Sequence, residues 1–173
     1  MIKNILEIQN FNTMIKIHIF ILTTLFINTL SFSQNKRKVI NNNKTQINQT
    51  LDTWHKYAAA SDFKNYFSLM DKKSVFVGTD SSEIWTKKEF MKYAKPVFKK
   101  KKAWKFTPTS RHIYISDNEQ IAWFDELLNT WMGKCRGSGV LVFKNGKWLI
   151  KQYVLSLTIP NDKMKGVIKF LNF

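Results

Sequence analysis

Two adjacent carboxylates, Asp125 and Glu126, lie in the middle of the otherwise apolar stretch IAWFDELLNT, residues 121–130. Successive side chains of a β-strand point to opposite faces, so one of the two carboxylates must lie among apolar neighbours. Burial raises the pKa of such a carboxyl group, which suits a general base or a hydrogen-bond anchor for a ligand. In the alternative, structural interpretation, Arg111, Arg136, His112 or a tyrosine neutralises the inward carboxylate. The sequence leaves open which carboxylate faces inward.

Other side chains are candidates for the same site. His112 lies next to Arg111 in a predicted strand and is a third catalytic candidate. Trp54 and Tyr57 fall on or beside the apolar stripe of the first predicted helix. Core packing is the ordinary role of such a tryptophan, and stacking on a ligand is the functional alternative.

A loop precedes the third predicted helix and contains Asp80 and Trp85, which suit the rim or lid of a pocket. Cys135 is the only cysteine of the chain, and the chain has only three histidines. Too few ligands remain for a structural zinc site. The sequence therefore predicts no metal and no cofactor.

Helical periodicity dominates the first half of the chain. Ile47, Leu51, Trp54 and Ala58 share one helical face. Ser61 is the predicted N-cap of a short second helix. A strand over 74–78 follows, and Thr86 with Glu89 forms a capping box that opens a third helix. Pro96 is expected to kink or end that helix.

The second half alternates with the period of strands, over 103–116, 121–130, 135–143 and 147–159. Asn145-Gly146 predicts a two-residue hairpin, which pairs Phe143 with Trp148 and Leu141 with Ile150. Continued without interruption, this register places Gln152 and Ser156 opposite the small residues Gly139 and Cys135. Those two side chains are thus the predicted polar groups of a cavity. The other face of the hairpin is also apolar, which predicts that a second subunit covers it.

Helices followed by antiparallel strands indicate an α+β fold. The segments TLDTWHKYAAASDFKNYFSLM, VFVGTDSSEIWTKKEF, IAWFDELL and CRGSGVLVFKNGKWLIKQYVLSLTIPND, within residues 45–160, resemble the SnoaL-like branch of the nuclear transport factor 2-like superfamily. The resemblance implies a cone, in which a strongly curved antiparallel sheet wraps around the N-terminal helices and a pocket opens at one end. It also implies a homodimer formed through the outer face of the sheet. It does not assign an activity, because the superfamily includes isomerases, cyclases, epoxide hydrolases, dehydratases and proteins without chemistry.

Residues 1–33 are predicted to be a signal peptide cleaved between Ser33 and Gln34, with an uncleaved membrane anchor as the alternative. Residues 34–44 are expected to form a flexible lead-in, and residues 161–173 a tail or short helix. The net charge is +16, but only three of the 28 basic residues are arginine. This argues against sequence-specific recognition of nucleic-acid base edges, in which arginine is the commonest contact.

These observations predict an exported, periplasmic or secreted protein that binds a small apolar or amphipathic molecule in an internal pocket without catalysis. One alternative is a cofactor-independent isomerase, lyase or hydrolase that uses a pocket carboxylate as its base. The second alternative is a basic module that binds acidic polymers or membrane surfaces. It would contact a membrane only through the leader or, weakly, through the basic tail.

Overall fold

The structure is a computed structural model that describes residues 40–172, and it has the predicted α+β composition. A helix over residues 40–59 is followed by α2 (Phe63–Ser68), β1 (Met70–Val77), β2 (Ile84–Thr86) and α3 (Lys87–Lys99). Four strands come next, then a short 3-10 helix and a last α-helix: β3 (Thr107–Ile115), β4 (Ile121–Thr130), β5 (Gly133–Lys144), β6 (Lys147–Leu157), η1 (Asn161–Lys163) and α4 (Met164–Leu171). The predicted signal peptide and its cleavage point lie outside the described residues. Among residues 40–172, no helix is long and apolar enough to cross a membrane.

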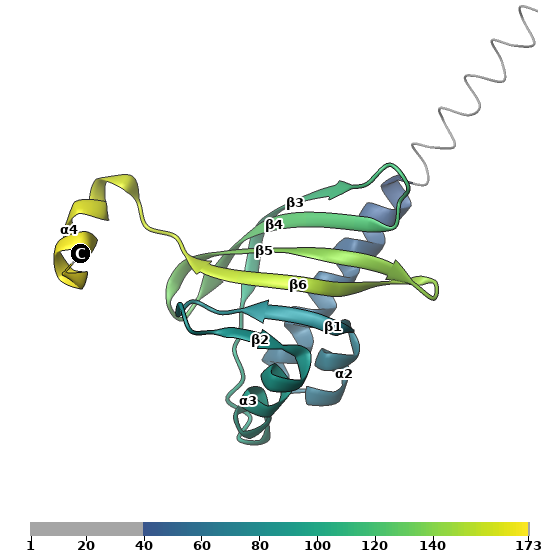
Figure 1. The fold of residues 1–173 in the computed structure, drawn as a ribbon, viewed down its shortest axis with the longest axis horizontal. Helices are drawn as coiled ribbons and strands as arrows, with labels where there is room; N and C mark the ends of the chain where they lie inside the picture. Colours follow the sequence, from purple (N-terminus) through teal and green to yellow (C-terminus); the bar gives the residue numbers. More distant parts are fainter. Residues whose placement is uncertain (1–39, 173) are drawn as a thin grey trace, which may run out of the picture. The chain divides into compact units, whose positions relative to one another are not determined.

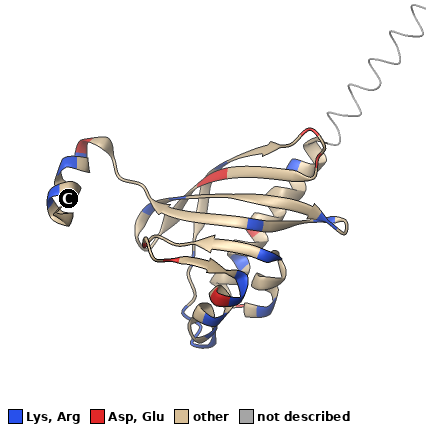
Figure 2. Ribbon diagram, in the orientation of Figure 1, with Lys and Arg blue, Asp and Glu red and all other residues tan. Residues whose placement is uncertain are grey.

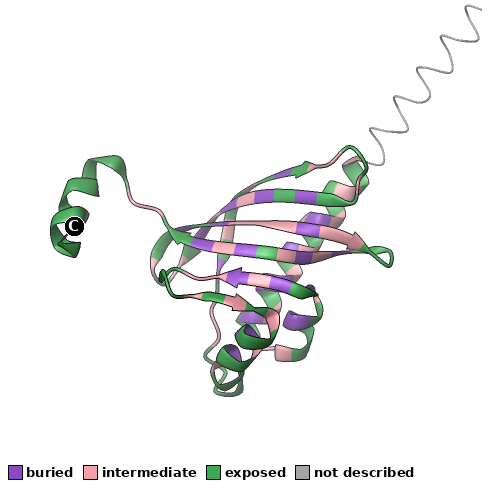
Figure 3. Cartoon of the chain, viewed as in Figure 1, coloured by how far each residue is buried: buried purple, intermediate pink, exposed green. Residues whose placement is uncertain are grey.

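The six strands form one curved sheet in the order β2-β1-β6-β5-β4-β3 (Figure 1). All neighbours are antiparallel except β1 and β6, which run parallel. The concave face packs on the first helix through the predicted stripe, because Ile47, Leu51, Trp54 and Ala58 are all at most 1% exposed. Figure 3 shows the resulting alternation of buried and outward residues along the long strands. The fold class predicted from the sequence is confirmed.

The boundaries of the first two helices differ from the prediction, whereas the start of α3 agrees with it. The first helix includes residues 40–44, part of the expected lead-in, where a hydrogen bond from Asn43 Nδ2 to Glu119 Oε2 (2.9 Å) offsets a weak helix propensity. The N-cap of α2 is Asp62 and not Ser61, because the Asp62 carboxylate accepts the Asn65 N–H while Ser61 has a φ of 54°. The predicted capping box of Thr86 and Glu89 is confirmed at the start of α3.

Pro96 lies inside α3 and does not end it, since the helix continues to Lys99. A proline removes one N–H donor and leaves the carbonyl four residues earlier without its helical partner. That residue is Lys92, which is exposed, so water can hydrate the carbonyl. Of the two predicted effects, a kink or an end of the helix, the end at Pro96 is wrong, because the solvent-facing position of the proline lets the helix continue.

The β5–β6 hairpin turns at Asn145 and Gly146, with φ angles of 51° and 78°, as the sequence predicts. The predicted pairs Phe143–Trp148 and Leu141–Ile150 are present. Beyond them a β-bulge inserts Lys151, so that Val140 pairs with Gln152 and Gly139 pairs with Tyr153. The bulge reverses the inward and outward positions for the rest of β6, because a one-residue slip moves every side chain to the other face.

Contacts from β1 accompany this bulge. The Asp71 carboxylate is only 3% exposed and accepts hydrogen bonds from Lys151 Nζ (3.0 Å) and Lys144 Nζ (2.7 Å). The pairing of β1 with β6 is also irregular at this level, between Met70 and Val75. The predicted cavity positions of Gln152 and Ser156 are therefore wrong. Both residues are exposed, whereas Tyr153 is fully buried.

Candidate functional site

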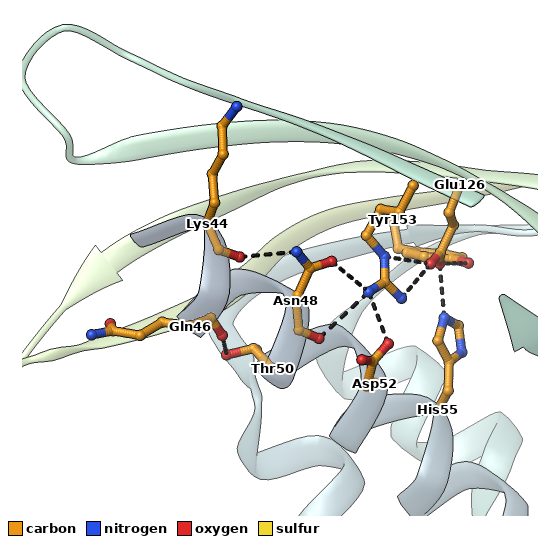
Figure 4. A network of polar contacts seen from close by, with 9 residues as sticks. Lys44, Gln46, Asn48, Thr50, Asp52, His55, Glu126 and Tyr153 are labelled. Atoms are coloured by element: carbon orange, nitrogen blue, oxygen red, sulfur yellow. Dashed lines mark hydrogen bonds and ion pairs between the residues drawn. The ribbon is translucent and has the colours of Figure 1, made fainter. Parts of the chain in front are cut away.

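Glu126 is the inward carboxylate of β4, and it is fully buried. Its Oε1 forms a 2.7 Å hydrogen bond with His55 Nε2 and accepts a 3.0 Å hydrogen bond from Tyr153 Oη. Its Oε2 accepts two hydrogen bonds from Arg111, from Nε at 2.9 Å and from Nη2 at 2.7 Å. Figure 4 shows the Glu126 carboxylate in contact with Tyr153 and with His55, which the first helix carries. The carboxylate therefore uses all four of its acceptor positions within the protein.

Arg111 connects this buried cluster to the first helix. Its Nη1 donates to Asp52 Oδ1 at 2.8 Å and to Asn48 Oδ1 at 3.0 Å, and the guanidinium-bearing side chain is only 7% exposed. Arg111 was one of the neutralising partners predicted from the sequence, and this role is confirmed, whereas His55 was not among the predicted partners. Asn48, Asp52 and His55 follow one another at helical spacing beside the apolar stripe. This polar stripe was the one feature of the sequence from which the position of His55 beside Arg111 could have been predicted.

Tyr153 reaches Glu126 because β5 has a glycine where the two side chains meet. A Cβ at Gly137 would overlap Tyr153 Oη and lie 3.0 Å from Glu126 Oε1. The glycines of β5 were predicted to border a cavity, but here the Tyr153 phenol fills that space. Burial, together with the Glu126 charge, raises the pKa of Tyr153 well above its ordinary value.

The electrostatics of Glu126 argue against a role as general base. Burial raises its pKa, but the hydrogen bond and charge of His55 and the charge of Arg111 outweigh this effect and hold the pKa below its ordinary value of 4.5. A base acting near neutral pH needs the opposite shift and an approach for the substrate proton. The arrangement is instead that of a structural ion cluster in the core.

We expect this cluster to make the fold acid-sensitive. A carboxylate whose folded pKa is depressed adds stability above its unfolded pKa and loses that contribution as the pH falls through the folded pKa. For Glu126 the loss begins as the pH falls below about 4.5. Urea unfolding between pH 7 and pH 3 measures it. The variant Glu126→Gln should show a shallower fall below pH 4.5 than the wild type, and an equal fall would contradict this assignment.

Asp125 and His112 lie on the outer face of the sheet, away from the buried cluster. Their side chains are 37% and 63% exposed, and Asp125 Oδ1 lies 3.2 Å from His112 Nδ1. An exposed pair of this kind contributes little to stability. The structure therefore separates the three catalytic candidates, with Glu126 inside and Asp125 and His112 outside.

A cavity of about 180 Å³ opens at the end of the sheet where β1 and β6 end and where β4 turns into β5. Aromatic rings form most of its walls. From β1, β2 and α3 come Phe76, Trp85, Phe90 and Tyr93, and from the segment before β3 and the β4–β5 turn come Trp104, Phe106 and Trp131. Glu83 is the one charged side chain in the lining. We call this cavity the aromatic pocket.

The remaining predicted site residues lie in different places. Trp85 lines the aromatic pocket, while Asp80 is exposed in the adjacent loop, where its carboxylate accepts hydrogen bonds from Ser82. Trp54 is 1% exposed and stacks on Tyr66 at 4.8 Å between ring centroids, so it belongs to the core. Tyr57 is partly buried and packs against that core. Neither Trp54 nor Tyr57 is part of the lining of the pocket.

Metal ligands do not gather within residues 40–172, where no group of three or more His, Cys, Asp or Glu side chains could hold an ion. Basic residues, in contrast, are spread over most of the elements (Figure 2). The lysine run at 99–102 lies at the end of α3 and in the following turn, and all four residues are exposed.

Residues 47–160 match the family model of the SnoaL-like domain. A protein of unknown function from Pseudomonas putida, described as nuclear transport factor 2-like, has a TM-score of 0.58 at 10% identity, covering 69% of this chain and 89% of that one. A proposed dehydratase of the same superfamily from Streptomyces avermitilis has a TM-score of 0.57 at 12% identity, covering 67% and 96%. The association domain of C. elegans CaMKII has a TM-score of 0.54 at 16% identity, covering 68% and 97%. A search of the curated proteins gives no match. At these identities the solved structures establish the fold alone.

Proposed function

The chain belongs to the SnoaL-like domain family, and on this premise we propose that it binds a small, mostly apolar molecule in the aromatic pocket without using Glu126 as a catalytic base. The family has ligand-binding members and some isomerases and dehydratases. The choice among these roles depends on the site. Here the buried carboxylate is fully occupied by protein groups, while a separate cavity is open at the end of the sheet.

The lining of the aromatic pocket carries the proposal. Seven of its twelve lining residues are aromatic, and Met132 and Leu155 add further apolar surface. Apolar walls with a few polar groups are typical of small-molecule sites. A volume of about 180 Å³ suits one ring-sized molecule, because an apolar cavity of roughly 150 Å³ in another protein binds benzene.

Indole and toluene are suitable probes, with binding followed by titration calorimetry. We expect saturable binding to the wild type and at least about tenfold weaker binding to Met132→Trp, whose indole would occupy the cavity. Met164→Trp is the matched control, because Met164 is in α4 and 38% exposed. Failure of both probes to bind at millimolar concentration, or unchanged binding to Met132→Trp, would refute the pocket.

We further propose that two copies associate through the outer face of the sheet. Tyr114 and Trp123 are directly paired there, stack at 5.8 Å between ring centroids, and are 49% and 48% exposed. Ile121 is 44% exposed and continues the patch toward Val142 of β5. Exposed contiguous apolar surface marks an interaction site, and an isologous dimer covers the same patch on both copies.

Sedimentation velocity at micromolar concentration tests this interface. The wild type is expected to sediment as a dimer and Trp123→Glu as a monomer, since the charge would be buried without a partner. Trp131→Glu is the control, because Trp131 is 82% exposed at the β4–β5 turn and lies outside this patch. A monomeric wild type, or a dimer that survives Trp123→Glu, would rule out the interface.

A further inference from the structure

The aromatic pocket has an unusual charge for this chain. Lys and Arg number 28 against 12 Asp and Glu, yet none of the twelve lining residues is basic and Glu83 is acidic. Three of the six tryptophans, Trp85, Trp104 and Trp131, lie in the same lining. The lining therefore differs from the rest of this basic chain in the sign of its charge.

Glu83 has no cationic partner of its own. Within residues 40–172, none of the ion pairs includes it. Its Oε2 accepts only a long hydrogen bond, from the Asp80 N–H at 3.3 Å. A partly buried carboxylate beside aromatic rings is therefore left with capacity for an external positive charge.

The backbone holds this carboxylate at the pocket. The Gly78 N–H donates to the Glu83 carbonyl at 2.8 Å, which closes the loop between β1 and β2. A Cβ at Gly78 would overlap Glu83 Oε2 and lie 2.9 Å from Glu83 Cδ. The glycine thus leaves the space into which the Glu83 side chain folds, and both residues line the pocket.

The rings themselves form a connected wall. Trp85 stacks on Tyr93 with ring centroids 4.6 Å apart and on Phe90 at 5.7 Å, and Phe90 stacks on Trp104 at 5.6 Å. Indole faces attract cations more strongly than other aromatic rings do, and rings combined with a carboxylate are the chemistry that selects methylated ammonium groups. A compact, strongly hydrated ion would lose more hydration energy in such a cavity than it gains.

From these observations we propose that the aromatic pocket binds a small organic cation with a methylated or quaternary ammonium group, with Glu83 as its counter-ion. This inference rests on the proposed binding function and adds the ligand class. The net charge of +16 repels cations at long range, so the local carboxylate is what makes the site selective for them.

Choline and its neutral isostere 3,3-dimethyl-1-butanol provide the test, because they have the same shape and differ in charge. We expect calorimetry to give at least about tenfold tighter binding of choline to the wild type. In Glu83→Gln this preference should disappear, because the glutamine amide supplies no counter-charge for the ammonium group. Asp80→Asn is the matched control, since Asp80 is exposed and outside the lining, and it should keep the preference.

Gly78→Ala provides a second variant that leaves the Glu83 charge intact but displaces it, and we expect a similar loss of choline preference. Equal affinities of the wild type for choline and the isostere, or a preference that persists in Glu83→Gln, would overturn the cation assignment. In that case the indole and toluene titrations still decide whether the pocket binds apolar molecules. If all four probes fail, both proposals are refuted.

Discussion

Replacing Arg111 with methionine is expected to lower the free energy of unfolding by about 3–5 kcal/mol, which is the usual cost of removing one partner from a buried ion pair. Arg111 supplies two of the four hydrogen bonds of the Glu126 carboxylate. Methionine fills a similar volume but donates no hydrogen bond, so a buried carboxylate would keep only His55 and Tyr153 as partners. Urea unfolding at pH 7 measures the difference.

Arg136→Met is the control for this prediction, because Arg136 is exposed in β5 and its loss should change stability by less than about 0.5 kcal/mol. A double-mutant cycle with Glu126→Gln separates the pair from other effects. If Arg111→Met costs as much in the Glu126→Gln background as in the wild type, the ion pair does not account for the loss.

Trp54→Ala is expected to cost about 3–5 kcal/mol of unfolding free energy, as is usual when a fully packed aromatic side chain is truncated to alanine. Trp54 is 1% exposed and contacts Tyr66 and Tyr153, with ring centroids 4.8 Å and 4.7 Å away. Its removal would leave a cavity between the first helix and the sheet. Chemical denaturation at pH 7 measures the loss.

A second substitution at Trp54 tests whether this side chain also contacts a ligand. Trp54→Phe keeps a ring in the core and should leave the affinity for indole unchanged, because Trp54 is not part of the pocket lining. Trp131→Ala is the stability control, since this side chain is 82% exposed and its truncation should cost less than about 0.5 kcal/mol. An equal destabilisation by Trp54→Ala and Trp131→Ala would contradict the assignment of Trp54 to the core.

Local signals in the sequence determined the fold class and most of its elements. The apolar stripe of the first helix, the capping box at Thr86 and the Asn145-Gly146 turn are all present as predicted. Each depends on residues at most a few helical turns apart, so that backbone geometry and side-chain period suffice to predict it. The same signals located Asp125 and Glu126 on opposite faces of one strand.

Only the tertiary structure determined which side chains from distant segments meet. The inserted Lys151 contacts Asp71, which is 80 residues away in the sequence. The bulge places Tyr153 and Leu155, in place of Gln152 and Ser156, on the inner face. The Glu126 cluster joins His55 across 71 residues. The aromatic pocket likewise takes its lining from β1, β2, α3, the segment before β3, the β4–β5 turn and β6.

The sequence by itself thus determined an α+β fold and an inward carboxylate, because these follow from local periodicity. Whether that carboxylate was free or saturated was decided only by the packing of the helix against the sheet, which brings His55 and Arg111 to Glu126. Strand register and side-chain partners are set by contacts between distant segments, and a single inserted residue reverses which side chains face the core.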